Sequence, residues 1–198
     1  MRGRKQCDPV NGCGKFYKSD LATCPSCKTP EAFATLVPYN PLDWVYDLET
    51  YPNVFTASFK HPATGVRMFF EISEHRNDLV ELVQFLHSLK AAGSRLIGFN
   101  NVGFDYPIIH FIIDYAHIAP TVTDIYNKAA AIIAAPWDRR FDHVIWDNDA
   151  HIQQIDLYKI HHFDNEARRT SLKILEFNMR SQNIEDLPYE PGRPLTPE

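Results

Sequence analysis

The 198-residue sequence has no long hydrophobic run and no apolar segment after its basic first residues. The apolar stretch at residues 108–113 is short and is interrupted by His110, whereas a membrane-spanning helix needs roughly 20 apolar residues. A secretion signal would place an apolar segment directly after the basic start. We therefore expect a soluble, cytoplasmic protein that does not use a membrane and whose thiols stay reduced.

Strong charge of one sign is also missing, since 20 basic and 25 acidic side chains give a net charge of −5. No general attraction to nucleic acid follows from this balance. The distribution is uneven, however: the first 30 residues carry six Lys or Arg against two Asp, and the remainder carries 14 against 23. A basic head on an acidic body indicates two modules with different roles.

Cysteine is absent after residue 27, and all four cysteines (Cys7, Cys13, Cys24 and Cys27) lie before that point. Two residues stand between Cys24 and Cys27, a spacing that lets one turn aim both thiolates at an ion. The upstream pair of cysteines completes a tetrahedral zinc site. The five residues between Cys7 and Cys13 exceed the usual two to four. Disulfides or separate thiols are the alternative, less expected without a secretion signal.

The first 30 residues are therefore predicted to form a small zinc ribbon, whose structural Zn²⁺ supplies its folding energy. Such a ribbon either binds nucleic acid, which its local positive charge would favour, or serves only as a scaffold. Residues 31–41 are expected to be a linker, and residues 42–198 a second domain whose hydrophobic content suffices for one sizeable core.

The second domain shows alternating and helical hydrophobic periodicity in turn. Asn77 is a candidate helix cap and Gly93 a candidate helix stop. The pattern predicts strands at 44–48, 54–59, 66–72, 95–99 and 151–158, and helices at about 77–93, 104–115, 123–134 and 171–177. Three strands, a helix, a strand and a helix indicate a mixed α/β fold.

Acidic side chains occur at two strand ends of this domain. Asp47 and Glu49 are two residues apart, so both point to the same face of a strand, where their charges are costly unless a cation neutralises them. Taken alone, the pair is also compatible with a strand end exposed to water. Asp105 follows the next apolar strand, with the amides of Asn100 and Asn101 beside it. Three such carboxylates fit Mg²⁺- or Mn²⁺-assisted phosphodiester chemistry.

Two motifs carry a family resemblance. Residues 44–55 (WVYDLETYPNVF) resemble the first exonuclease motif of the DEDD superfamily, in the form found in bacteriophage family B-like DNA polymerases. Residues 98–107 (GFNNVGFDYP) resemble the second motif, Asn-x-x-x-Phe-Asp, and residues 155–176 are similar to the segment that follows it. The resemblance implies a ribonuclease-H-like domain over residues 42–198, which removes mismatched 3′ nucleotides from DNA with two metal ions.

The resemblance also implies residue roles. Asp47 and Glu49 would be metal ligands, with Asp47 bridging both ions and Asp105 supporting the second. Asn100 would help to place the DNA strand. Further candidates for substrate contact are Asn101, Phe104 and Tyr106, although Phe104 also fits a core position. The expected partners are a single-stranded 3′ end of DNA and polymerase domains, located downstream or in trans.

A third motif of the family, Tyr-x-x-x-Asp, does not occur after Asp156. We therefore expect either the N-terminal exonuclease region of a longer polymerase, truncated before this motif, or a natural protein that binds DNA without cutting it. In both cases the 198 residues alone are expected to be weakly active or inactive. The alternative function is a zinc-dependent module that binds nucleic acid or a replication partner and carries a non-catalytic, nuclease-like body.

Overall fold

The computed structural model describes residues 4–7, 15–18, 21, 23–26, 34–36, 40–139, 141–162, 171–178, 189–190 and 192–196. The chain divides into two compact units, Met1–Asn40 and Pro41–Glu198. Within the described residues, no helix is both long and apolar enough to cross a bilayer.

The first unit contains three short antiparallel strands in the order β2-β1-β3. Cys7 and Cys24 are buried beside Tyr17 and form a small core. Cys13 and Cys27 lie outside the described residues, so the zinc ribbon stays a prediction. The third strand falls in the stretch expected to be a linker, and the sheet therefore extends beyond residue 30. The strands are β1 (Arg4–Cys7), β2 (Phe16–Lys18) and β3 (Ala34–Leu36).

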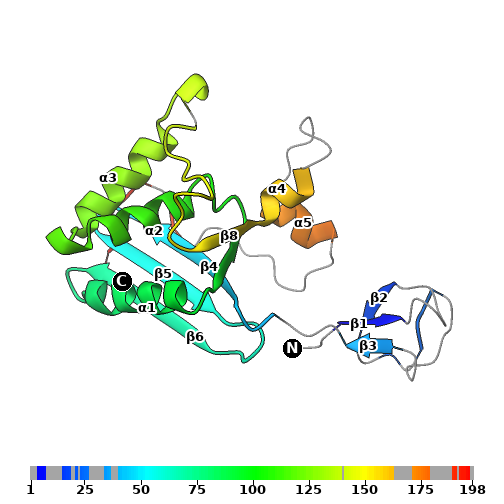
Figure 1. The fold of residues 1–198 in the computed structure, drawn as a ribbon. Helices are drawn as coiled ribbons and strands as arrows, with labels where there is room; N and C mark the ends of the chain where they lie inside the picture. Colours follow the sequence, from blue (N-terminus) through cyan, green and yellow to red (C-terminus); the bar gives the residue numbers. More distant parts are fainter. Residues whose placement is uncertain are drawn as a thin grey trace. The chain divides into compact units, whose positions relative to one another are not determined.

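The second unit is built on a five-stranded mixed sheet in the order β6-β5-β4-β7-β8 (Figure 1). The first three of its strands form an antiparallel meander, and the last two run parallel to β4. This sheet, flanked by helices, confirms the predicted mixed α/β class. The strands are β4 (Asp43–Thr50), β5 (Val54–Lys60), β6 (Arg67–Ser73), β7 (Arg95–Gly98) and β8 (Gln153–Asp156).

The helices begin and end close to the predicted positions. Asn77 Oδ1 accepts a hydrogen bond from Leu79 N, although Asp78 holds the cap position of α1. The expected strand at 151–158 is shorter, because α4 begins at Leu157. The described helices are α1 (Leu79–Ala91), α2 (Asp105–Asp114), α3 (Val122–Ile133), α4 (Leu157–His162) and α5 (Leu172–Asn178), with 3₁₀ turns η2 (Ala116–Ile118) and η3 (Trp137–Arg139).

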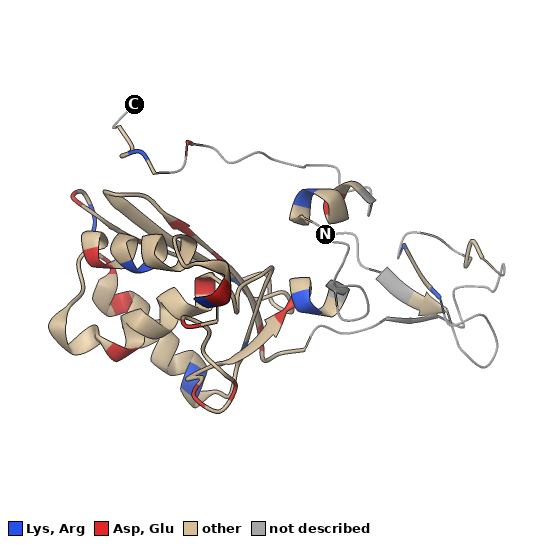
Figure 2. Ribbon diagram, turned by 90° about the horizontal axis from the view of Figure 1, so that it is seen from above, with Lys and Arg blue, Asp and Glu red and all other residues tan. Residues whose placement is uncertain are grey.

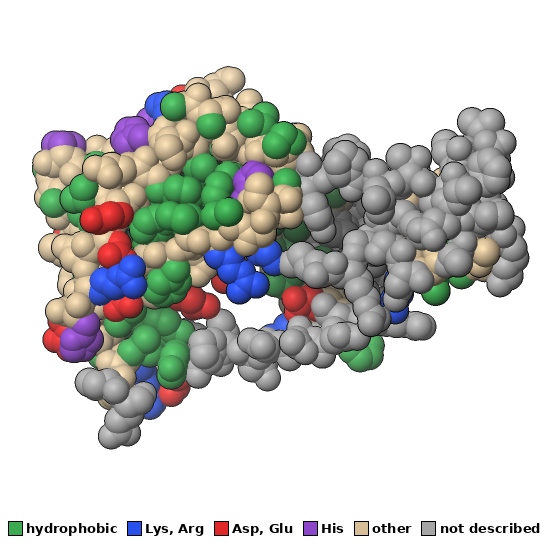
Figure 3. Space-filling view, turned by 90° about the horizontal axis from the view of Figure 1, so that it is seen from below, with side chains coloured by type: hydrophobic (Ala, Val, Ile, Leu, Met, Phe, Trp, Pro, Cys, Tyr) green, Lys and Arg blue, Asp and Glu red, His purple; other side chains and the backbone are tan. Residues whose placement is uncertain are grey.

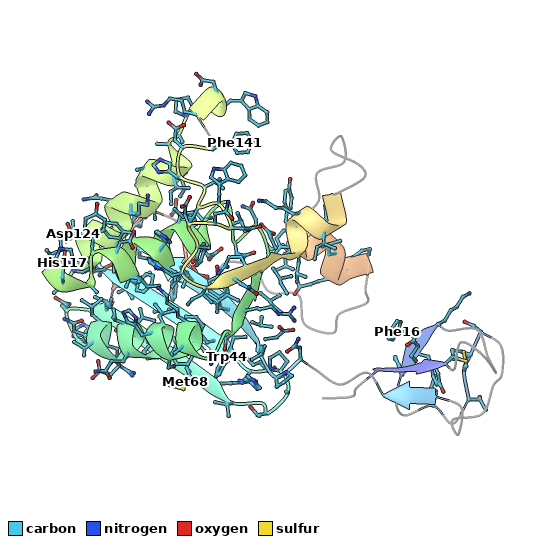
Figure 4. All side chains as sticks on the ribbon, in the orientation of Figure 1. Phe16, Trp44, Met68, His117, Asp124 and Phe141 are labelled. Atoms are coloured by element: carbon cyan, nitrogen blue, oxygen red, sulfur yellow. The ribbon has the colours of Figure 1, made fainter. Side chains whose placement is uncertain are left out.

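One face of the sheet is buried under helices and the other is open. On β4, Tyr46 and Leu48 are buried, whereas Val45 and Asp47, which alternate with them, are exposed, as the two-residue period of a strand requires. Helix α1 contacts β6, and α3 contacts β5 and β4. The buried side chains of the sheet and of α1, α2 and α3 form one hydrophobic core. Trp44 and Met68, labelled in Figure 4, are partly buried against it.

Candidate metal-binding carboxylate site

The carboxyl ends of β4, β7 and β8 meet at the same edge of the sheet. Val45 of β4 pairs with Ile97 of β7, and Gly98 pairs with Asp156 of β8. Because the three strands are parallel, the residues that follow these positions are brought to one edge. Figure 2 marks acidic positions on strands and helix ends of this unit. The topology thus unites acidic groups from three separate parts of the chain.

Asp47 and Glu49 point to the open face of β4, as expected from their spacing. Partial desolvation raises the pKa of both carboxyl groups above their ordinary values. The charge of Asp47 raises the pKa of Glu49 further, while a hydrogen bond with the side chain of Tyr51 lowers it. The two carboxylates therefore repel one another across the open face of the sheet.

Asp105 is the first residue of α2 and is buried, with 8% of its surface exposed. Burial raises the pKa of its carboxyl to about 7, and the negative charges of Asp47 and Asp156 contribute. Of the two charges, that of Asp47 raises the pKa of Asp105 more than that of Asp156 does. The structure therefore brings the Asp105 carboxyl near the carboxyl of Asp47.

Positive side chains do not offset these charges in the described residues, where Asp47, Glu49 and Asp105 make no ion pair with Lys or Arg. Arg95 pairs instead with Asp43, at the opposite end of β4. Carboxylate oxygens are the ligands that hard divalent cations prefer. Asp47 interacts electrostatically with both Glu49 and Asp105, and all three carboxyl groups have raised pKa values and no cationic partner among the described side chains. Their oxygens do not all lie within 4.8 Å of one another in this structure, so a divalent cation held by all three would draw them closer together.

A tight turn between β7 and α2 sets the position of Asp105. Asn100 adopts a left-handed conformation (φ 60°), which asparagine tolerates better than most residues. A Cβ atom at Gly98 would lie 2.7 Å from Asn101 Cβ, and one at Gly103 would lie 2.8 Å from Asn100 Oδ1. Close approach therefore requires a glycine at position 98, whereas at position 103 the crowding atom is the end of the Asn100 side chain, which can turn away. The side chain of Asn100 is exposed at the site.

Asn101 is fully buried beneath the turn. Its Nδ2 donates to Gln154 Oε1 over 2.8 Å, and the Tyr46 hydroxyl donates to the same oxygen over 3.2 Å. Tyr106 is also fully buried, and its hydroxyl accepts a hydrogen bond from Ile152 N over 3.0 Å. These two residues thus anchor the turn and α2 in the core. Of the four candidates for substrate contact, Asn100 is exposed and Phe104 is partly buried against the core.

Asp156, to which the sequence analysis gave no role, holds the turn from the other side. Its Oδ1 accepts from Asn100 N and from Tyr158 N, both over 2.9 Å, and its Oδ2 accepts from Val102 N over 3.3 Å. The residue is buried, and its charge raises the pKa of Asp105. The sequence does show that an acidic residue, Asp156, ends an apolar strand. The hydrogen-bond partners of Asp156, however, follow only from the register of β8 on β7.

A groove of about 450 Å³ adjoins Asp47 on the open face of the sheet. Besides Asp47, its walls include the cationic side chains of Lys60 and Arg67 and the exposed ring of Phe69. Figure 3 shows one face of the molecule, where hydrophobic side chains lie among basic and acidic ones. A groove that offers cations and an aromatic ring next to acidic metal ligands suits a phosphate-bearing strand with bases.

No protein-family model matches the sequence, and no curated protein or solved structure matches it either.

Proposed function

We propose that the Pro41–Glu198 unit is a ribonuclease-H-like 3′-to-5′ exonuclease region of a DNA polymerase, which hydrolyses DNA phosphodiester bonds with two divalent metal ions. The carrying observation is that Asp47, Glu49 and Asp105 lie towards one end of the sheet, where the charge of Asp47 raises the pKa of both other carboxyl groups. The order of strands and helices and the two motif resemblances support the same function.

The chemistry assigns a different task to each acid. Asp47 lies between Glu49 and Asp105, so it is the residue suited to bridge two Mg²⁺ or Mn²⁺ ions, with the other two as single ligands. Ions bound there would lower the pKa of an attacking water and stabilise the leaving oxygen. The raised carboxyl pKa values favour this role, because a bound cation relieves the repulsion that raises them.

The substrate is placed by the groove beside Asp47. Lys60 and Arg67 offer positive charge for backbone phosphates, and Phe69 offers a ring on which a base can stack. Asn100, exposed at the turn before Asp105, is positioned to contact the terminal nucleotide. This arrangement favours a single-stranded 3′ end over a duplex, whose bases are already stacked on one another.

Hydrolysis by the 198 residues is proposed to be slow. The resemblance implies a fourth acid and a water-orienting tyrosine, and the chain offers neither at the family spacing. Metal-dependent binding of DNA is therefore a sharper test of the function than turnover.

The experiment measures binding of a single-stranded oligonucleotide with a 3′ hydroxyl end, at low salt, with and without Mn²⁺. We expect Mn²⁺ to strengthen binding in the wild type, and Asp47→Ala and Asp105→Ala to abolish this effect. Trace shortening of the oligonucleotide from its 3′ end is expected on long incubation.

Asp147→Asn is the matched control, because Asp147 is exposed on the loop before β8, away from the three carboxylates in sequence and topology. It should keep the Mn²⁺ effect. If binding is the same with and without Mn²⁺ and is unchanged in Asp105→Ala, the exonuclease proposal is wrong, and a non-catalytic binding module replaces it.

A further inference from the structure

A second group of metal-ligand side chains lies at the other end of α2. His110 and Asp114 are one helical turn apart on α2, and His151 lies two residues before β8. One ligand atom from each of the three lies within 4.8 Å of the other two. Asp114 lies nine positions after Asp105 on α2, which corresponds to about 13 Å along the helix axis. This group is therefore distinct from the carboxylate site.

The distances converge on Asp114. His110 Nδ1 lies 3.0 Å from Asp114 Oδ2, and His151 Nε2 lies 2.7 Å from Asp114 Oδ1. The two imidazole rings are stacked, with centroids 4.5 Å apart and planes 18° from parallel. In a tetrahedral zinc site with bonds of roughly 2.0–2.1 Å, ligand atoms are about 3.4 Å apart. To admit an ion, the nitrogen–oxygen separations of 3.0 Å and 2.7 Å would each widen to about 3.4 Å.

The second nitrogen of His110 supports this geometry. His110 Nε2 lies 3.1 Å from the backbone carbonyl of Asp149. A histidine that ligates a metal through one nitrogen commonly donates its other N–H to a carbonyl, which fixes the tautomer and the ring. In this structure Nδ1 of His110 donates to Asp114. With an ion bound, the Asp149 carbonyl would hold the ring proton on Nε2 and leave Nδ1 free to ligate.

We propose that His110, Asp114 and His151 form a site for a divalent transition ion of the Zn²⁺ class, which fastens the chain before β8 to the end of α2. Two imidazoles and a carboxylate are ligands that such ions take. The half-exposed Asp114 leaves the remaining position to water. The site goes beyond the proposed exonuclease function, which does not use these residues.

Lys90 makes the proposal sharply testable. Its Nζ lies 3.1 Å from His151 Nδ1. When Nε2 of His151 holds an ion, Nδ1 carries the proton and can only donate, as can the lysine ammonium. Lys90 thus opposes metal binding, and a glutamine at this position, whose carbonyl accepts a hydrogen bond, would support it.

The experiment measures Zn²⁺ bound per full-length chain by equilibrium dialysis against buffered Zn²⁺, with thermal stability recorded in parallel. His151→Gln and His110→Gln should each weaken the affinity for one of the bound Zn²⁺ ions about tenfold or more. Each should also remove part of the thermal stabilisation that Zn²⁺ gives. Lys90→Gln should tighten the binding of the same ion. All variants keep the cysteines and the carboxylate site, so the difference from wild type isolates this group.

The control is His87→Gln, which removes an exposed histidine from α1 and should leave Zn²⁺ binding unchanged. A gain of affinity in Lys90→Gln cannot come from misfolding, so it supports the proposal even where a ligand variant is unstable. Equal Zn²⁺ affinity and stoichiometry in wild type, His151→Gln and Lys90→Gln would overturn it, and the three side chains would then be a hydrogen-bonded bridge only.

Discussion

At the residue scale, the carboxyl of Asp105 links stability to function. Its pKa of about 7 in the folded chain lies above the ordinary value of 3.8, so the folded state holds this proton more tightly than the unfolded chain does. The stability that protonated Asp105 provides is present at low pH and is lost as pH rises from about 4 to about 7. A bound divalent cation would offset this loss, which is how a poorly solvated acid can serve a metal site.

Asp105→Asn is therefore expected to stabilise the metal-free protein above pH 7, because the amide mimics the protonated acid. The gain has an upper limit of about 4 kcal/mol in the free energy of unfolding, and it should shrink towards zero near pH 4. Urea unfolding at pH 5 and pH 8, with the exposed Asp147→Asn as control, measures it. A destabilised Asp105→Asn at pH 8 would contradict this.

Asp156 acts through the backbone of the turn rather than on a substrate. Asp156→Asn replaces one acceptor oxygen by a donor, so at least one of the three N–H groups of Asn100, Val102 and Tyr158 loses its partner. We expect a loss of about 1–3 kcal/mol in unfolding free energy and faster amide hydrogen exchange at Asn100 and Val102. Unchanged exchange at these two amides would contradict the positioning role.

At the scale of elements, the approach of β7 to the turn before α2 decides where Asp105 lies. In Gly98→Ala the added Cβ would meet Asn101 Cβ at 2.7 Å, so one of the two segments must move. We expect a loss of about 1–3 kcal/mol and weaker Mn²⁺ binding. Chemical denaturation and Mn²⁺ titration check both effects.

A double-mutant cycle separates this contact from other effects of the alanine. Asn101→Ala leaves the Cβ but removes the amide atoms that crowd the added methyl group, at 3.0 Å and 3.4 Å. The loss in Gly98→Ala/Asn101→Ala should therefore be smaller than the sum of the two single losses. Strict additivity would show that the amide atoms of Asn101 do not add to the cost of the methyl group, which would then come from the contact with the Asn101 Cβ alone.

Most elements of the second unit were predictable because their signals are local. Alternation marked β4, β5 and β6, and the apolar spacing around Leu82 and Leu86 marked α1. The grouping of Asp47, Glu49 and Asp105 was expected from their spacing and from the family resemblance, and as a metal site it stays a proposal. Asp156 and His151 were missed because their partners are far away in sequence: Asn100 lies 56 residues before Asp156, and Asp114 lies 37 residues before His151. Only the pairing of β8 with β7 reveals them.

At the scale of the whole molecule, the chain combines a small unit, with a three-stranded sheet and the buried Cys7 and Cys24, and a larger α/β unit that carries both candidate metal sites. The net charge of −5 gives no sign of DNA binding, and the cations that we propose to contact DNA are few and local. Lys60 and Arg67 lie on adjacent strands and are paired across them, so they present two charges at one place beside the acids.

This local charge predicts a specific salt dependence. Arg67→Ala should weaken binding of single-stranded DNA and reduce the slope of log K against log salt by about 0.7, the value for one phosphate contact. Arg139→Ala is the control, because Arg139 is held by Asp142 at 2.7 Å on an exposed turn. Fluorescence anisotropy between 50 and 200 mM salt, the range over which such contacts weaken markedly, measures the slopes. Equal slopes for Arg67→Ala and wild type would exclude the groove as the strand path.

Binding of divalent metal by Asp47, Glu49 and Asp105 together is tested most directly by counting Mn²⁺ bound to the full-length chain at pH 8, in the wild type and in Asp47→Asn/Glu49→Gln/Asp105→Asn. His110, Asp114 and His151 remain intact in both, and Asp147→Asn/Glu74→Gln is the control. We expect the triple variant to lose Mn²⁺ ions that the wild type and the control retain. Equal Mn²⁺ stoichiometry and affinity in all three would show that these carboxylates do not bind metal.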